Sequence, residues 1–125
     1  MTTPTTSLPP VAWDVAVETA RLKEQHANRL VVERLAEELS LPAPTIVARP
    51  ELVYVSVADP DELVEWLGAL GGEIQRSAVF EGVQLWSLRT FALPSSSGSR
   101  VPVRVSVPVP VGESVMPELL RAVAS

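Results

Sequence analysis

The segment VPVRVSVPVPV, residues 101–111, constrains the fold more than any other part of the chain, because valine occupies every odd position. Neighbouring residues of a β-strand point to opposite faces of the sheet, so all of these valines share one face. Burial of a valine gains about 1.5–3 kcal/mol, whereas ordering the backbone costs about 1–2 kcal/mol per residue. The segment is therefore expected to be stable only within a larger sheet that has one buried face.

The prolines of this segment constrain its neighbours in the sheet. Amide groups of alternate residues in a strand face opposite neighbours. Pro102, Pro108 and Pro110 share one parity and have no N–H group, so one flank of the strand lacks donors at these positions. We therefore predict an edge strand that pairs on one flank and resists further pairing on the other.

Three other stretches are expected to be helical. Residues 13–39 contain neither proline nor glycine and repeat apolar residues at helical spacing, which predicts one long helix or two shorter ones. Asp59 and Pro60 suit the cap and first position of a second helix, and Gly71-Gly72 ends it. Residues 116–123 are spaced like a short C-terminal helix.

The remaining patterned segments predict strands, with a hairpin turn at Glu81-Gly82. These strands are expected at residues 45–48, 52–57, 73–80 and 83–92. We expect one α+β domain over residues 11–125, preceded by a disordered leader at 1–10. Its sheet would be mainly antiparallel with four to five strands, the long N-terminal helix and two shorter helices would pack on one face, and strand 52–57 would lie beside 73–80.

Composition argues against most enzymatic chemistries. The chain has no cysteine, and His26 is its single histidine, so neither a thiolate site nor a two-histidine metal site is expected. The carboxylates at 59–62 are explained by a helix cap, and Ser95-Ser96-Ser97 by a polar loop. We therefore expect a protein that is not an enzyme and that has no cofactor and no metal.

Four arginines form the candidate anion-facing surface: Arg76, Arg89, Arg100 and Arg104 lie in or beside expected strands. Such a sheet face could contact nucleic-acid phosphates, which gives the alternative function of a nucleic-acid-binding accessory or regulatory protein. The net charge of −5 and the pI of about 4.8 disfavour attraction to a polyanion.

The N-terminal helix supplies the candidate protein interface, formed by Val11, Trp13, Val15 and Leu22. These residues place apolar side chains on two sides of the helix. Either both sides are buried within one chain, or one of them is covered by a protein partner or a second copy. The function favoured by the sequence is a small non-enzymatic protein-interaction or adaptor module that acts as a homo-oligomer or with a protein partner.

The sequence also bears on localisation and family. The N-terminus lacks the features of a secretory signal, and no apolar run is long enough for a membrane span, so we expect a cytoplasmic protein without membrane association. Over about residues 27–110 the chain resembles uncharacterised small proteins of Streptomyces and other actinobacteria, some from phages and integrative elements. The resemblance implies a cytoplasmic accessory protein and assigns no site residue. It is carried by Leu41-Pro42-Ala43-Pro44, the valine-rich strand, Asp59-Pro60-Asp61-Glu62-Leu63, Trp66, Leu70-Gly71-Gly72 and the hairpin.

Overall fold

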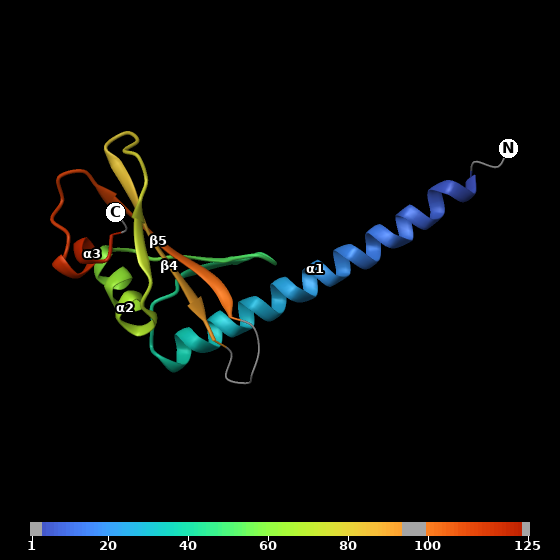
Figure 1. Ribbon diagram of the computed structural model, residues 1–125, viewed down its shortest axis with the longest axis horizontal. Coiled ribbons are helices and arrows are strands. Elements are labelled where there is room, and N and C mark those ends of the chain that lie inside the picture. Colours follow the sequence, from blue (N-terminus) through green and yellow to red (C-terminus); the bar gives the residue numbers. More distant parts are fainter. Residues whose placement is uncertain (1–3, 94–99, 124–125) are drawn as a thin grey trace.

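The protein is an α+β domain with one five-stranded sheet, as expected (Figure 1). The structure, a computed structural model, describes residues 4–93 and 100–123, and side chains from Val15 onward; the loop predicted at Ser95-Ser96-Ser97 lies outside these residues. The strands follow the order β1-β2-β5-β4-β3, and every neighbouring pair is antiparallel except β2 and β5. The elements are α1 (Pro4–Glu38), β1 (Thr45–Ala48), β2 (Val53–Ser56), α2 (Pro60–Leu70), β3 (Glu73–Arg76), β4 (Val83–Ala92), β5 (Val101–Pro110) and α3 (Pro117–Arg121).

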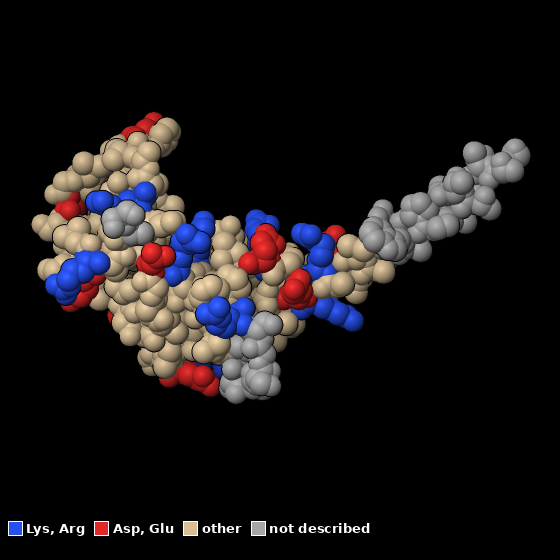
Figure 2. Space-filling model, viewed as in Figure 1, with Lys and Arg blue, Asp and Glu red and all other residues tan. Residues whose placement is uncertain are grey.

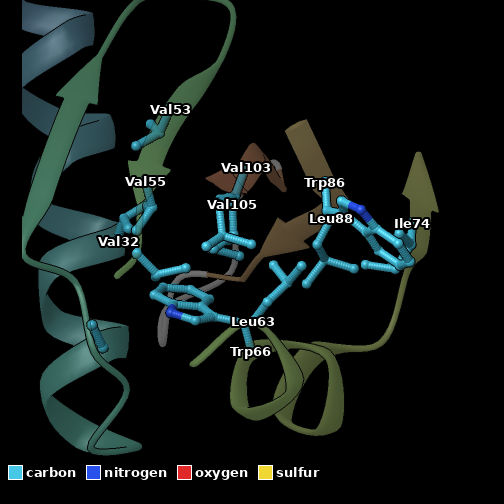
Figure 3. Close-up of a cluster of buried hydrophobic side chains, with 14 of the residues drawn as sticks. Val32, Val53, Val55, Leu63, Trp66, Ile74, Trp86, Leu88, Val103 and Val105 are labelled. Atoms are coloured by element: carbon cyan, nitrogen blue, oxygen red, sulfur yellow. The ribbon is translucent and has the colours of Figure 1, made fainter. Parts of the chain in front are cut away.

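The odd-numbered valines of β5 form the middle of the hydrophobic core, as the alternation predicted. Those at 101, 103, 105, 107 and 109 are buried, whereas Val111 lies past the end of the strand and is exposed. Val32 of α1 and Leu63 and Trp66 of α2 pack against this face in the same cluster (Figure 3). The helices therefore cover one face of the sheet.

The prediction that 101–111 is an edge strand is wrong. β5 lies in the centre of the sheet, paired with β4 along its whole length and with β2 over Val103–Ser106. The backbone groups of the even-numbered residues do face β2, as the alternation predicted: the amide of Val57 donates to the Ser106 carbonyl (3.0 Å). Within the paired segment the even-numbered residues are Arg104 and Ser106, which both have a backbone N–H group. The prolines lie outside this segment, so they do not prevent the pairing.

The predicted position of strand 52–57 is also wrong. β2 lies between β1 and β5, and β3 lies at the far edge beside β4. Helix α2 packs over β4 and β5 and so carries the chain across the sheet between β2 and β3. β3 is also shorter than the expected strand 73–80. Beyond Arg76 the Ser77 amide still donates to the Leu85 carbonyl (2.9 Å), and an isolated bridge joins Phe80 to Val83 at the turn.

Helix α2 has the predicted caps. The Asp59 carboxylate accepts a hydrogen bond from the amide of Glu62 (3.2 Å), and Gly71 ends the helix with a φ of 71°. Trp66 is fully buried, and its indole N–H donates to the Pro42 carbonyl (2.7 Å), which fixes the turn after α1 against the core.

The ends of the domain complete the helical layer. α1 is one continuous helix of 35 residues, and it begins at Pro4, inside the segment expected as a leader. α3 buries Leu119, and the amide of Ile74 in β3 donates to the Ala122 carbonyl (2.8 Å). This contact covers part of the free edge of β3.

Candidate interaction surfaces

Two surfaces of the described protein lack a covering layer, and the first is the outer part of α1. We call residues 15–27 the outer segment of this helix. Figure 1 shows α1 projecting well beyond the body. The body holds the helix from Asn28 onward: the Asn28 amide donates to the carbonyls of Arg49 (3.3 Å) and Pro50 (3.1 Å), and Val32 and Ala36 are buried in the core.

The outer segment exposes two of the four residues predicted as a protein interface. The side chain of Val15 is 61% exposed and that of Leu22 is 55% exposed. Burial of both apolar sides within one chain, the first alternative of the sequence interpretation, therefore does not hold for these two residues. The side chains of Val11 and Trp13 lie outside the described part of the structure. Acidic and basic side chains are interspersed where the helix leaves the body (Figure 2).

The second surface is the face of the sheet that points away from the helices, which we call the open face. Two rows of paired residues cross it from β3 to β1. The charged row comprises Glu73, Arg89, Arg104, Tyr54 and Val47. The hydroxyl row comprises Gln75, Ser87, Ser106, Ser56 and Thr45. Small side chains dominate the second row, in which Ser87 and Ser106 share a hydrogen bond (Oγ to Oγ, 2.9 Å).

The open face unites three of the four predicted arginines. Arg89 and Arg104 lie directly opposite each other on β4 and β5, and the Arg100 guanidinium stacks 4.3 Å from the centre of the Phe91 ring.

Arg76 does not join them, so this part of the expectation is wrong. It pairs with Trp86 on the helical side, and its guanidinium lies 5.4 Å from that ring. The sequence could have predicted this placement, because Arg76 lies two residues after the buried Ile74 and residues two apart in a strand share a face.

A hollow of about 330 Å³ lies beside the charged row. Its lining includes Arg89 and Arg104 together with two carboxylates, Glu51 and Glu73. The Nε atom of Arg104 is shielded from solvent without a hydrogen-bond partner, and among the described residues the ion pair within 4 Å is that of Arg29 and Glu33. The charges of the hollow are therefore not neutralised by direct contacts within the described chain.

Apolar side chains surround these charges, and the sequence interpretation did not single them out. Exposed residues of this kind on the open face are Val47, Tyr54, Val83, Leu85 and Phe91. A sequence signal was available for Tyr54, which alternates with the buried Val53 and Val55, and for Phe91, which lies between two buried residues. A sheet face that is both apolar and charged is suited to contact with another protein.

Catalytic features are sparse in the described residues. No group of three or more histidine, aspartate or glutamate side chains is arranged to hold a metal ion there. His26 is exposed on the outer segment of α1, and Asp59 serves as a helix cap. Among the described residues, no helix has the length and apolar character needed to cross a membrane.

Comparison with known proteins adds no relative: no family model, no curated protein and no solved structure matches the chain. The function must therefore be inferred from the two surfaces themselves.

Proposed function

We propose that this protein is a small, non-enzymatic, cytoplasmic protein-interaction module that binds its partner through the outer segment of α1. One observation carries the proposal: this segment extends beyond the body with Val15 and Leu22 in solvent. The resemblance to actinobacterial and mobile-element accessory proteins agrees with such a role and names no partner.

The energetics of helices support this role. Isolated helices shorter than about 12–15 residues are marginal in water, and protein helices gain most of their stability from packing of an apolar side. The outer segment has no such packing among the described contacts, in which the helix meets the body from Asn28 onward. Val15 and Leu22 are two turns apart on one side, the spacing of anchor residues in helices that bind a groove.

The test is the double substitution Val15→Glu/Leu22→Glu. Circular dichroism should show a folded protein, because both side chains are exposed, and binding of the native partner from host extract should be lost. The matched control is Ala16→Glu/Lys23→Gln, which has the same spacing and the same charge change but lies on another side of the helix, at residues that are also exposed. It should retain binding.

Partner binding should also slow amide hydrogen exchange at residues 15–27 of the wild type. The proposal fails if the double variant unfolds, if it retains every partner of the wild type, or if exchange in this segment is unchanged by the partner.

Nucleic-acid binding is the second candidate. It is favoured by the placement of Arg89, Arg100 and Arg104 on one face with the aromatic rings of Tyr54 and Phe91, on which bases could stack. The carboxylates in the same hollow and the net charge of −5 oppose it. A gel-shift series against salt decides: retardation with a steep salt dependence supports this function, and no retardation at low salt removes it.

A further inference from the structure

We propose that the partner of the outer segment is a second copy of this chain, and that the segment lies on the open face of that copy. The proposal rests on the proposed function, which requires a protein at Val15 and Leu22, and it adds the identity of that protein and the surface used. In the resulting dimer each copy supplies the helix that the other copy's sheet lacks.

The geometry of α1 permits this exchange. Its packed part covers the helical face of its own sheet, and the same straight helix continues past the edge of the body. Consider a second copy beside the first, related by a two-fold axis in the plane of the two sheets. The rotation exchanges the two sides of the second copy, so its open face lies on the same side as the first copy's α1, and the projecting part of that helix can lie on it. By symmetry the second copy's α1 lies on the first copy's open face, and one isologous arrangement covers both surfaces.

The outer segment reaches across much of the open face. Residues 15–27 have a length of about 20 Å at 1.5 Å per residue. The two longest strands, β4 and β5, have 10 residues each, a length of about 33 Å. The outer segment therefore spans more than half the length of the longest strands.

The area of the contact sets the expected strength of the dimer. A helix about 10 Å wide and 20 Å long covers about 200 Å² of a sheet. Two such contacts, counted on both copies, bury about 800 Å², which is below the range of about 1,200–2,000 Å² for stable interfaces and typical of weak, transient ones. The size therefore predicts a dimer that dissociates on dilution.

The charges are complementary. Glu18 is exposed and lies between Val15 and Leu22 on the same side of the helix, three residues after the first and four before the second. Arg89 and Arg104 lie in the open face with apolar residues at both ends, Phe91 on one side and Leu85 on the other. A helix side with a central carboxylate and flanking apolar residues thus matches a sheet face with central guanidinium groups and flanking apolar residues.

The guanidinium groups of the open face have no carboxylate in direct contact among the described residues. Arg89 has Arg104 opposite it on β5, and like charges in this position destabilise a sheet. Glu73 lies opposite Arg89 on β3 but forms no ion pair with it within 4 Å. The buried Nε of Arg104 has no acceptor, and an unsatisfied buried donor is unfavourable. The small side chains of the hydroxyl row, such as Ser87 and Ser106, leave room for a helix to approach closely.

Sedimentation equilibrium of the full chain tests the proposal through a charge exchange. The wild type should form a concentration-dependent dimer. Glu18→Arg alone and Arg89→Glu alone should each weaken dimerisation about tenfold or more, because like charges then face each other across the interface. An equimolar mixture of the two variants should recover dimers. In the mixed dimer the introduced arginine of one chain meets the introduced glutamate of the other, while the second contact keeps its native charges.

Two controls guard against indirect effects. Leu120→Glu places a charge on an exposed side chain of α3, away from the open face, and should leave the dimer unchanged. If either single variant fails to fold by circular dichroism, the double variant Glu18→Arg/Arg89→Glu in one chain replaces the mixture and should dimerise like the wild type.

Three results would overturn the proposal: a wild type that is monomeric at every concentration, single variants that dimerise normally, or neither the mixture nor the double variant recovering dimers. Failure of the proposed function is distinguishable. If Val15→Glu/Leu22→Glu abolishes dimers while Arg89→Glu does not, the outer segment binds protein but not the open face. If a monomeric wild type still loses a host partner on the same double substitution, the proposed function stands and self-association is excluded.

Discussion

Pro108 and Pro110 are expected to keep part of β5 from pairing with other sheets. β2 ends at Ser56, and its last contact on this flank joins Val57 to Ser106. Beyond this point no described strand pairs with β5 on the β2 side. Pro108 and Pro110 therefore lie where the β2 side of β5 has no neighbouring strand in the described structure, and they offer no N–H group to a strand from another molecule.

The perturbation is Pro108→Thr/Pro110→Thr, which restores two backbone donors without enlarging the apolar surface. A hydrogen bond contributes about 0.5–1.5 kcal/mol net, so two new donors add about 1–3 kcal/mol to edge-to-edge association. This corresponds to an association constant that is about five- to 150-fold larger. Because both positions lie at the end of the strand and are exposed, the fold should be retained.

Sedimentation velocity over a concentration series measures the effect. The control is Val111→Thr at an exposed residue just past the strand, whose amide already donates to the Gly82 carbonyl, so the substitution adds no backbone donor. We expect larger assemblies for the double proline variant and none beyond the wild-type state for the control. Identical sedimentation of the wild type and the proline variant would refute the reasoning.

Three further substitutions test the fold by urea denaturation. Asp59→Ala removes the acceptor of the Glu62 amide and should lower the free energy of unfolding by about 0.5–2 kcal/mol; no change would mean that the cap is not formed. Gly72→Ala forces a side chain at a φ of 124° and toward the backbone oxygen of Arg89, so we expect a loss of about 1–3 kcal/mol or more, and wild-type stability would contradict the observed turn. Trp66→Ala should cost about 3–5 kcal/mol through the cavity it leaves, and a loss below about 1 kcal/mol would place this residue outside the core.

Local patterns in the sequence predicted local structure well. The caps of α2, the antiparallel pairs β3–β4 and β4–β5, and the buried parity of the β5 valines follow from residues close together in the chain. Each depends on side-chain alternation or on a turn, and both act within a few residues.

The sheet order could not be predicted, because the parallel contact between β2 and β5 joins segments about 50 residues apart. The prolines of β5 indicate which side of the strand lacks backbone N–H groups. They do not indicate the length of the strand that pairs there. A four-residue β2 fits between Pro102 and Pro108, so a strand with the composition of an edge can occupy the centre.

The candidate surfaces were predicted in part for the same reason. Arg89 and Arg104 alternate with buried residues of their own strands, which places them on the open face. That they lie opposite each other depends on the register of β4 and β5, and their proximity to Glu51 depends on the order of the sheet. Neither is encoded in a short stretch of sequence.

Residue-resolved amide hydrogen exchange along α1 tests the central claim most directly. The account predicts protection of residues 28–36 in both the dimeric wild type and the Arg89→Glu variant, because this part packs on its own core. Residues 15–27 should be protected in the wild type and exchange rapidly in the variant, whose open face no longer accepts the helix. Equal protection of residues 15–27 in both proteins would contradict the account.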